Sequence, residues 1–294
     1  MDKNRAVARF DEAVRLIPLD LRPEIRRLNF DERSITEEIR LRLGKKPSVL
    51  IGGRERTFSQ HTVTETHLNT LMEMIGGSVH TVSNAMSRGY ITTDNGFRVG
   101  ICGDAAVYEG KIMGFHRITS ANIRISRDYF GIAKDVATEI IDGNRVMSTL
   151  IISPPGGGKT TFLRDLIREL SNMGYRVSVA DERKEICPGF NVGDTVDFLE
   201  GIEKSAAIDM LVRSMSPQVI AVDEITAKND IEAIKNAAYC GVSMIATAHS
   251  GGASELYKRP LYRALMEEEI FQRVVEVSIG DMRTYIVRRV EELT

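Results

Sequence analysis

The chain has 294 residues, of which 43% are hydrophobic and 27% are charged, and its formal net charge is −2. This composition supplies enough apolar surface for a core, excludes a wholly disordered chain, and gives no overall basic field for nucleic acid. Three widely spaced cysteines, no apolar run of membrane-spanning length, and a charged first segment without a signal-peptide core predict a reduced cytosolic protein.

The first part of the chain carries the pattern of a small α/β domain. Apolar residues at helical spacing predict amphipathic helices, and strict alternation of apolar and charged residues predicts half-buried strands. Asp94-Asn95-Gly96 predicts a hairpin turn, and a second turn is expected at 109–111. The predicted helices cover 2–17, 65–75 and about 81–88, and the predicted strands cover 37–43, 48–51, 90–93, 97–101 and 121–127.

In the second part of the chain, short apolar strands alternate with helices. The predicted strands cover 148–152, 176–180, 218–222 and 243–248, and the predicted helices cover 160–173, 203–215 and 230–239. This alternation predicts a parallel, doubly wound sheet. We therefore expect an N-terminal α/β domain over 1–128 and a second α/β domain over 129–294.

The strongest motif is SPPGGGKTT, between a predicted strand and a predicted helix. Its end matches the Walker A pattern, and Ser153 stands where the first glycine belongs. Small residues let backbone N–H groups approach phosphate oxygens, and the helix that follows directs its positive dipole end at them. Lys159 can neutralise phosphate charge and Thr160 can bind Mg²⁺. The predicted ATP-binding residues are Ser153, Pro154, Pro155, Gly156, Gly157, Gly158, Lys159, Thr160 and Thr161.

Two acidic pairs follow predicted strands. In VIAVDEI, Asp223 is expected to hold Mg²⁺ and Glu224 to activate water, as in a Walker B motif. In VADERKEI, Asp181 can hold Mg²⁺ and Glu182 can position water. The alternative for the second pair is a solvated helix start with Asp181 as its N-cap.

Histidine and arginine supply further candidates. His249, just after the strand over 243–248, can sense a phosphate by hydrogen bonding, although a structural role is the alternative. Arg117, Arg124 and Arg127 precede the second domain, and phosphoryl transfer often uses an arginine from a neighbouring domain or subunit. The alternative for each arginine is a solvated strand face.

The order of GGGKTT, DERKEI, VRSMSPQVIAVDEI and ATAHS resembles the secretion ATPase superfamily, and within it the branch of endospore-forming bacteria, over residues 37–250. The resemblance implies a P-loop NTPase (RecA/AAA-like) domain that binds ATP and Mg²⁺ between itself and a smaller N-terminal α/β domain. It also implies the roles of individual residues. These are catalytic roles for Glu224, Glu182 and His249, a histidine box that includes Thr247, metal binding by Thr160, Asp223 and Asp181, and nucleotide contacts from Arg124 and Arg127.

The resemblance further implies an ATP-hydrolysing motor that powers assembly of, or transport through, a secretion-like channel during sporulation. Its partners would be further copies of itself in a homo-hexameric ring and membrane proteins of the sporulation channel, with no nucleic acid. It would lie in the mother-cell cytoplasm, peripherally associated with the membrane complex.

Two other functions remain open at this point. A nucleic-acid-binding P-loop ATPase would use the arginine-rich strand of residues 38–45 as its footprint. A small-molecule kinase is less favoured, because no lid-like arginine cluster follows the phosphate loop and an Asp-Glu pair favours water as the acceptor.

Overall fold

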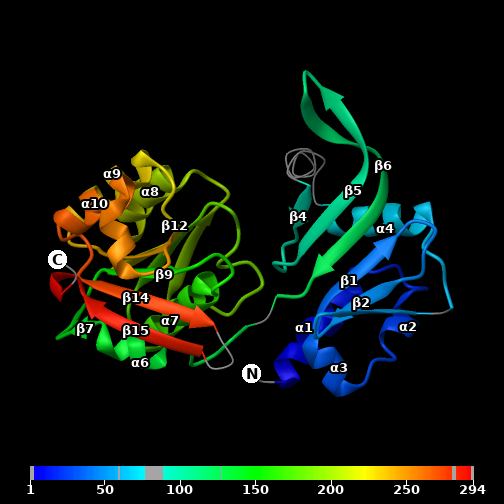
Figure 1. Cartoon of the computed structure of the whole chain (residues 1–294), viewed down its shortest axis with the longest axis horizontal. Coiled ribbons are helices and arrows are strands. Elements are labelled where there is room, and N and C mark those ends of the chain that lie inside the picture. Colours follow the sequence, from blue (N-terminus) through cyan, green and yellow to red (C-terminus); the bar gives the residue numbers. More distant parts are fainter. Residues whose placement is uncertain (1–2, 59, 77–88, 127, 280–282, 293–294) are drawn as a thin grey trace. The chain divides into compact units, whose positions relative to one another are not determined.

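The computed structural model describes residues 3–58, 60–76, 89–126, 128–279 and 283–292. The chain forms two compact units, Met1–Asp128 and Tyr129–Thr294, each with its own sheet and buried core (Figure 1). The helix predicted near 81–88 and the candidate Arg127 lie outside the described residues. None of the described helices combines the length and the hydropathy needed to traverse a lipid bilayer.

The N-terminal unit is built on an antiparallel sheet with the strand order β3-β2-β1-β6-β5-β4 in the described residues. Its elements are α1 Lys3–Arg15, α2 Arg22–Ile25, α3 Phe30–Ile35, β1 Thr36–Arg42, β2 Ser48–Ile51, β3 Arg54–Thr57, α4 Glu65–Ile75, β4 Tyr90–Thr92, β5 Arg98–Tyr108 and β6 Lys111–Arg124. The alternation predicted for β1 is present, because Ile39 and Leu41 are buried while Arg40 and Arg42 are half-exposed. These apolar side chains pack with Phe10 of α1 and other residues of α1 and α4.

The second unit holds a mixed sheet with the described strand order β11-β10-β12-β13-β9-β14-β15. Its elements are α6 Lys134–Glu139, β7 Ile141–Asp142, β8 Arg145–Val146, β9 Thr149–Ser153, α7 Lys159–Asn172, β10 Val177–Asp181, β11 Val196–Glu200, α8 Lys204–Met215, β12 Val219–Glu224, α9 Lys228–Tyr239, β13 Ser243–His249, η1 Ala253–Lys258, α10 Pro260–Glu267, β14 Arg273–Ile279, β15 Arg283–Arg289 and η2 Val290–Glu292. The predicted parallel sheet is confirmed for β11, β10, β12, β13, β9 and β14, and β15, which was not predicted, pairs antiparallel with β14 at one edge.

Helices cover both faces of this sheet. Successive residues of one strand belong to different cores: Leu150 and Ile152 pack with α8, α9 and α10, whereas Ile151 packs with α6 and α7. Four adjacent parallel strands, β10, β12, β13 and β9, end at the same edge. Because ligands of such sheets bind beyond the carboxyl ends of the strands, this edge is where the predicted site residues are expected to meet.

Candidate functional site

The loop between β9 and α7 leads from a strand end directly into a helix N-terminus. Gly156 and Gly158 have φ values of 76° and 84°, in the left-handed region that glycine adopts without strain. Gly158 is the N-cap of α7 and offers no side chain to the first N–H groups of the helix. These N–H groups and the helix dipole make the loop suited to bind phosphate oxygens.

Ser153 fills the space that the Walker A pattern leaves to a glycine. Its side chain is buried, and its hydroxyl donates a hydrogen bond to the Pro154 carbonyl at 3.0 Å. A Cβ atom added to Gly157 would lie 2.7 Å from the Cβ of Ser153 and 3.0 Å from the Pro154 carbonyl oxygen. The loop therefore accommodates the serine because residue 157 has no side chain.

His249, at the end of β13, contacts both the phosphate-binding helix and the end of β12. Nζ of Lys159, the first residue of α7, lies 3.1 Å from Nε2 of His249, and that Nε2 lies 3.4 Å from Oε2 of Glu224 at the end of β12. Nδ1 of His249 is buried and has no hydrogen-bond partner among the described residues. Lys159 and Glu224, which belong to separate motifs, thus each lie within contact distance of His249.

A second contact joins the phosphate loop to β12. The hydroxyl of Thr160 lies 3.5 Å from Oδ1 of Asp223, and the hydroxyl of Thr247 donates to the same oxygen at 3.0 Å. Hydroxyl and carboxylate oxygens are ligands that Mg²⁺ accepts, directly or through water. Thr160 and Asp223 therefore fit a Mg²⁺ ion beside a phosphate bound in the loop, and Thr247 holds the carboxylate in place.

Asp181 has a different environment from the other acidic residues. Its carboxylate is fully buried and accepts three backbone N–H bonds, from Glu185 at 2.8 Å, Ile186 at 2.8 Å and Cys187 at 3.0 Å. Burial nonetheless raises the pKa of Asp181, and the charge of Asp223 adds to the rise. The alternative of a solvated helix start was wrong, because turns follow β10 and Asp181 shapes them from inside. Its metal-binding role stays a prediction.

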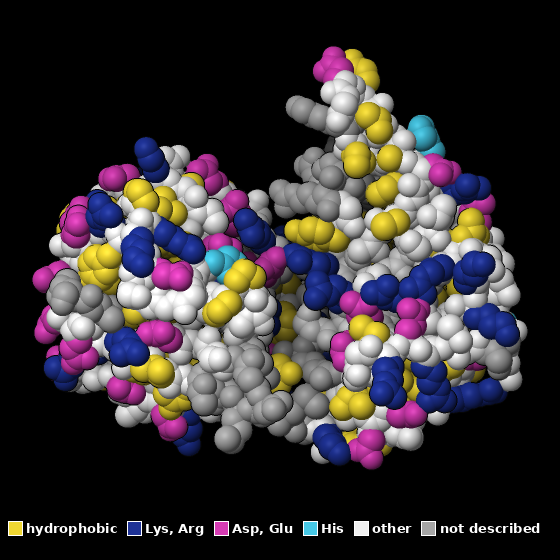
Figure 2. Space-filling view, in the orientation of Figure 1, with side chains coloured by type: hydrophobic (Ala, Val, Ile, Leu, Met, Phe, Trp, Pro, Cys, Tyr) yellow, Lys and Arg dark blue, Asp and Glu magenta, His cyan; other side chains and the backbone are white. Residues whose placement is uncertain are grey.

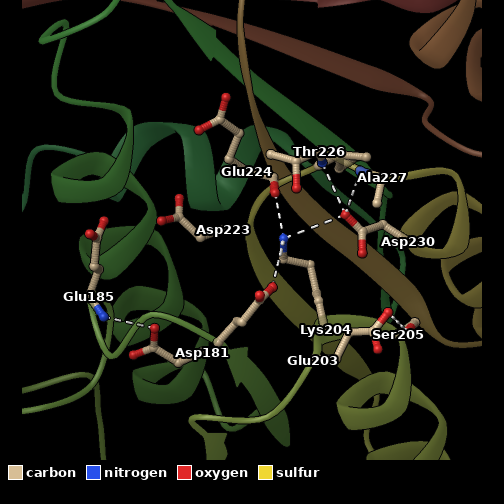
Figure 3. A network of polar contacts seen from close by, with 12 residues as sticks. Asp181, Glu185, Glu203, Lys204, Ser205, Asp223, Glu224, Thr226, Ala227 and Asp230 are labelled. Atoms are coloured by element: carbon tan, nitrogen blue, oxygen red, sulfur yellow. Dashed lines mark hydrogen bonds and ion pairs between the residues drawn. The ribbon is translucent and has the colours of Figure 1, made fainter. Parts of the chain in front are cut away.

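The Glu182 carboxylate lies near a buried pair, Lys204 and Asp230, that was not predicted from the sequence. Its Oε2 lies 3.7 Å from Nζ of Lys204, and this ammonium also lies 3.6 Å from Oδ2 of Asp230 (Figure 3). Lys204 and Asp230 are both buried. No sequence signal marks them, because each lies near the start of a helix in a polar stretch that is typical of a solvated surface.

The remaining candidates have the following surroundings within their own units. Pro154 and Pro155 are exposed on the loop, and Thr161 is half-buried in the first turn of α7. Arg124 belongs to β6 of the N-terminal unit, where its Nε lies 4.0 Å from Oε1 of Glu38. Its contact with nucleotide, like that of Arg127, stays a prediction.

The arginine-rich strand of the nucleic-acid alternative is paired with acidic side chains. Arg40 lies 2.6 Å from Glu38, and Arg42 forms an ion pair with Glu55. Hydrogen bonds from Arg42 and Ser48 lower the pKa of Glu55 to about 2. Acidic side chains lie among the basic ones on the face of this unit that Figure 2 shows. The strand therefore offers little uncompensated positive charge to a phosphate backbone.

The sequence of the chain is similar to that of a known protein family. The family model described as "Sporulation stage III, protein AA" matches residues 8–286. The stage III sporulation protein AA of Bacillus subtilis (strain 168) is 36% identical over 255 residues, which cover 82% of this chain and 82% of that protein.

Two solved structures share the fold. The ATPase DotB of Legionella pneumophila has a TM-score of 0.60 and 18% identity, covering 86% of this chain and 76% of its own. The pilus retraction motor PilT with bound ADP has a TM-score of 0.59 and 17% identity, covering 86% of this chain and 78% of its own. These matches confirm the predicted fold class, a P-loop α/β domain with a smaller N-terminal α/β domain.

Proposed function

The chain belongs to the family "Sporulation stage III, protein AA", and from that premise we propose that it hydrolyses ATP to drive a secretion-like channel during sporulation. The observation that carries the proposal is the meeting of Lys159, His249 and Glu224 beside a glycine-rich loop. A phosphate-binding cation and a carboxylate able to act as a base are the two groups that hydrolysis of a phosphoanhydride needs.

The residues present fit ATP and Mg²⁺. The main-chain N–H groups of Gly156, Gly158 and the first turn of α7 would bind the phosphates, and Lys159 would neutralise their charge. Thr160 and Asp223 would hold Mg²⁺, which would stabilise the negative charge of the phosphoryl group. Asp181 would join this set only through water, because its carboxylate oxygens already accept three backbone N–H bonds.

Glu224 is the general base of the proposed reaction. Its carboxylate takes a proton from the attacking water, so that the water oxygen bonds to phosphorus as the bond to ADP breaks. The His249 ring lies between that carboxylate and Lys159, in contact with both. Glu182, exposed beside Lys204, is a second carboxylate that can position water.

We further propose that the working form is a homo-hexameric ring in the mother-cell cytoplasm, docked on membrane proteins of the sporulation channel. Support comes from the fold shared with DotB and the pilus retraction motor PilT and from the kinship to a stage III sporulation protein. In such a ring an arginine such as Arg124 or Arg127 would reach a nucleotide from an adjacent domain or subunit.

The test compares ATP hydrolysis by the wild-type chain, Lys159→Ala and Glu224→Gln. We expect Mg²⁺-dependent release of phosphate by the wild type and loss of turnover in both variants. Unchanged turnover in both variants would rule out this site. Mass measurement in solution, with and without ATP, tests the ring, and a strict monomer under both conditions argues against a motor.

A further inference from the structure

Lys204 donates a hydrogen bond to the main chain of Glu224, the proposed base. Its Nζ donates a hydrogen bond to the main-chain carbonyl of Glu224 at 2.5 Å, while the Glu224 side chain faces His249. Lys204 is only 4% exposed, and its ammonium lies 3.7 Å from Oε2 of Glu182 and 3.6 Å from Oδ2 of Asp230. Figure 3 labels Lys204 and Asp230 in this cluster. A lysine buried to this extent loses its hydration and is kept only where such partners replace it.

The turn that follows Glu224 is fixed by the same cluster. Oδ2 of Asp230 accepts the N–H groups of Thr226 and Ala227, each at 3.0 Å. The hydroxyl of Tyr262 donates to the carbonyl of Ile225 at 3.0 Å. Side chains from α8, α9 and α10 therefore hold each of the four residues 224–227 by its main chain.

These main-chain contacts fix the direction in which the Glu224 side chain projects. β12 has a register shift between Val222 and Glu224, and its ladder with β13 resumes with the pair Glu224 and Thr247. Lys204 adds a constraint from the other side of the strand, at the Glu224 carbonyl. It also draws Glu182, from the end of β10, towards the same ammonium.

From these contacts we propose that Lys204 is a positioning residue for hydrolysis. It fixes the direction of the Glu224 side chain through the main-chain carbonyl of that residue, and it holds the Glu182 carboxylate beside its own ammonium. The inference rests on the proposed function and extends it to a residue with no expected contact to nucleotide. A displacement of about 1 Å in a reacting group can cost about 10²-fold in rate. Lys204 should therefore govern turnover and leave ATP affinity largely unchanged.

The experiment compares Lys204→Met, Lys204→Arg and Lys228→Met in steady-state ATP hydrolysis. Lys228 is the matched control, because it is also the first residue of a helix but is exposed. We expect Lys204→Met to lower kcat about 10²-fold with KM changed by less than about threefold. Lys204→Arg, which keeps the charge and the donor, should recover most of the loss, and Lys228→Met should match the wild type.

A double variant separates positioning from charge balance. Removing Lys204 alone leaves Asp230 buried without its cation, which can unfold the unit, whereas Lys204→Met/Asp230→Asn removes both charges. If Lys204 only balances charge, this double variant regains wild-type kcat, and that result would overturn the inference. If it anchors the Glu224 carbonyl, the double variant folds, binds ATP and stays slow.

The outcomes also separate this inference from the proposed function. A wild-type hydrolase whose Lys204→Met variant keeps its kcat contradicts the inference alone. Equal losses of kcat and ATP affinity in Lys204→Met contradict it as well. A folded wild type that binds ATP without cleaving it contradicts the proposed function, and the inference falls with it.

Discussion

Nζ of Lys159 lies 3.1 Å from Nε2 of His249, so one hydrogen bond joins the start of the phosphate-binding helix to the end of β13. Because the lysine ammonium can only donate, Nε2 is the acceptor in this bond. Oε2 of Glu224 lies 3.4 Å from the same Nε2, so the histidine ring contacts both the cation and the proposed base.

This connection predicts that His249→Ala impairs turnover more than binding. The loop and Lys159 remain to hold phosphate, whereas Glu224 loses the ring that its carboxylate contacts. We expect kcat to fall about 10- to 100-fold and ATP affinity to change by less than about threefold. Steady-state hydrolysis and titration with a fluorescent ATP analogue measure both. His116→Ala, at an exposed position of β6, is the control; parallel losses of kcat and affinity in His249→Ala would contradict the assignment.

The contact between Gly157 and Ser153 predicts a compensating pair of substitutions. Gly157→Ala places a methyl group 2.7 Å from the Cβ of Ser153, so the loop must move and nucleotide should bind about tenfold more weakly or worse. Ser153→Gly/Gly157→Ala removes that clash and should regain part of the affinity. The pair is compared by titration with labelled ADP, with Met173→Ala, at the exposed far end of α7, as control. Full affinity in Gly157→Ala alone would show that the loop does not depend on this contact.

Thr247 should act on Mg²⁺ through Asp223. Thr247→Val keeps the shape of the side chain but loses the 3.0 Å hydrogen bond that holds the Asp223 carboxylate. Loss of such an outer partner typically costs about 10- to 100-fold in metal affinity or activity. The concentration of Mg²⁺ for half-maximal hydrolysis should rise accordingly in Thr247→Val and stay near the wild-type value in Thr247→Ser. An unchanged Mg²⁺ requirement in Thr247→Val would argue against Asp223 as a metal ligand.

Tyr262 predicts a loss of stability at high pH. Burial raises its pKa to about 12, and the negative charges of Glu224 and Asp230 add to the rise. Its hydroxyl donates to the Ile225 carbonyl within the core. The folded state thus keeps this proton more tightly than the unfolded chain, whose tyrosines ionise near pH 10. The stability that Tyr262 contributes is complete below about pH 10 and is lost as the pH rises towards about 12.

Urea unfolding of the wild type and of Tyr262→Phe, measured across this pH range, checks that sign. The difference in unfolding free energy between them should shrink as the pH rises. A difference that stays constant above pH 10 would mean that the Tyr262 hydroxyl does not titrate with folding.

The sequence predicts the centre of the site because its residues follow apolar strands. Lys159, Asp223 and His249 each lie at the end of a strand or the start of the next helix, and parallel strands bring such ends to one edge. The fold class followed from the same alternation. The spacing of the motifs along the chain does not specify which of their side chains contact each other.

The sequence does not predict which polar and charged side chains are buried. Lys204 and Asp230 lie in polar stretches at helix starts and are buried only because α8 and α9 pack around the end of β12. Asp181 was not predicted to be buried, but its carboxylate accepts three main-chain N–H bonds inside the unit, and its metal-binding role stays a prediction. The hairpin of β14 and β15 was not predicted, and its pairing with β9 joins segments far apart in the chain.

The most direct measurement is the identity of the nucleotide that stays bound after incubation with Mg²⁺ and ATP and rapid gel filtration. Glu224→Gln should elute with uncleaved ATP, because the phosphate-binding groups remain while the proposed base is lost. The wild type should elute with ADP, and Lys159→Ala should elute with neither. ADP bound to Glu224→Gln in the same yield as to the wild type would contradict the central claim that this site cleaves ATP with Glu224 as its base.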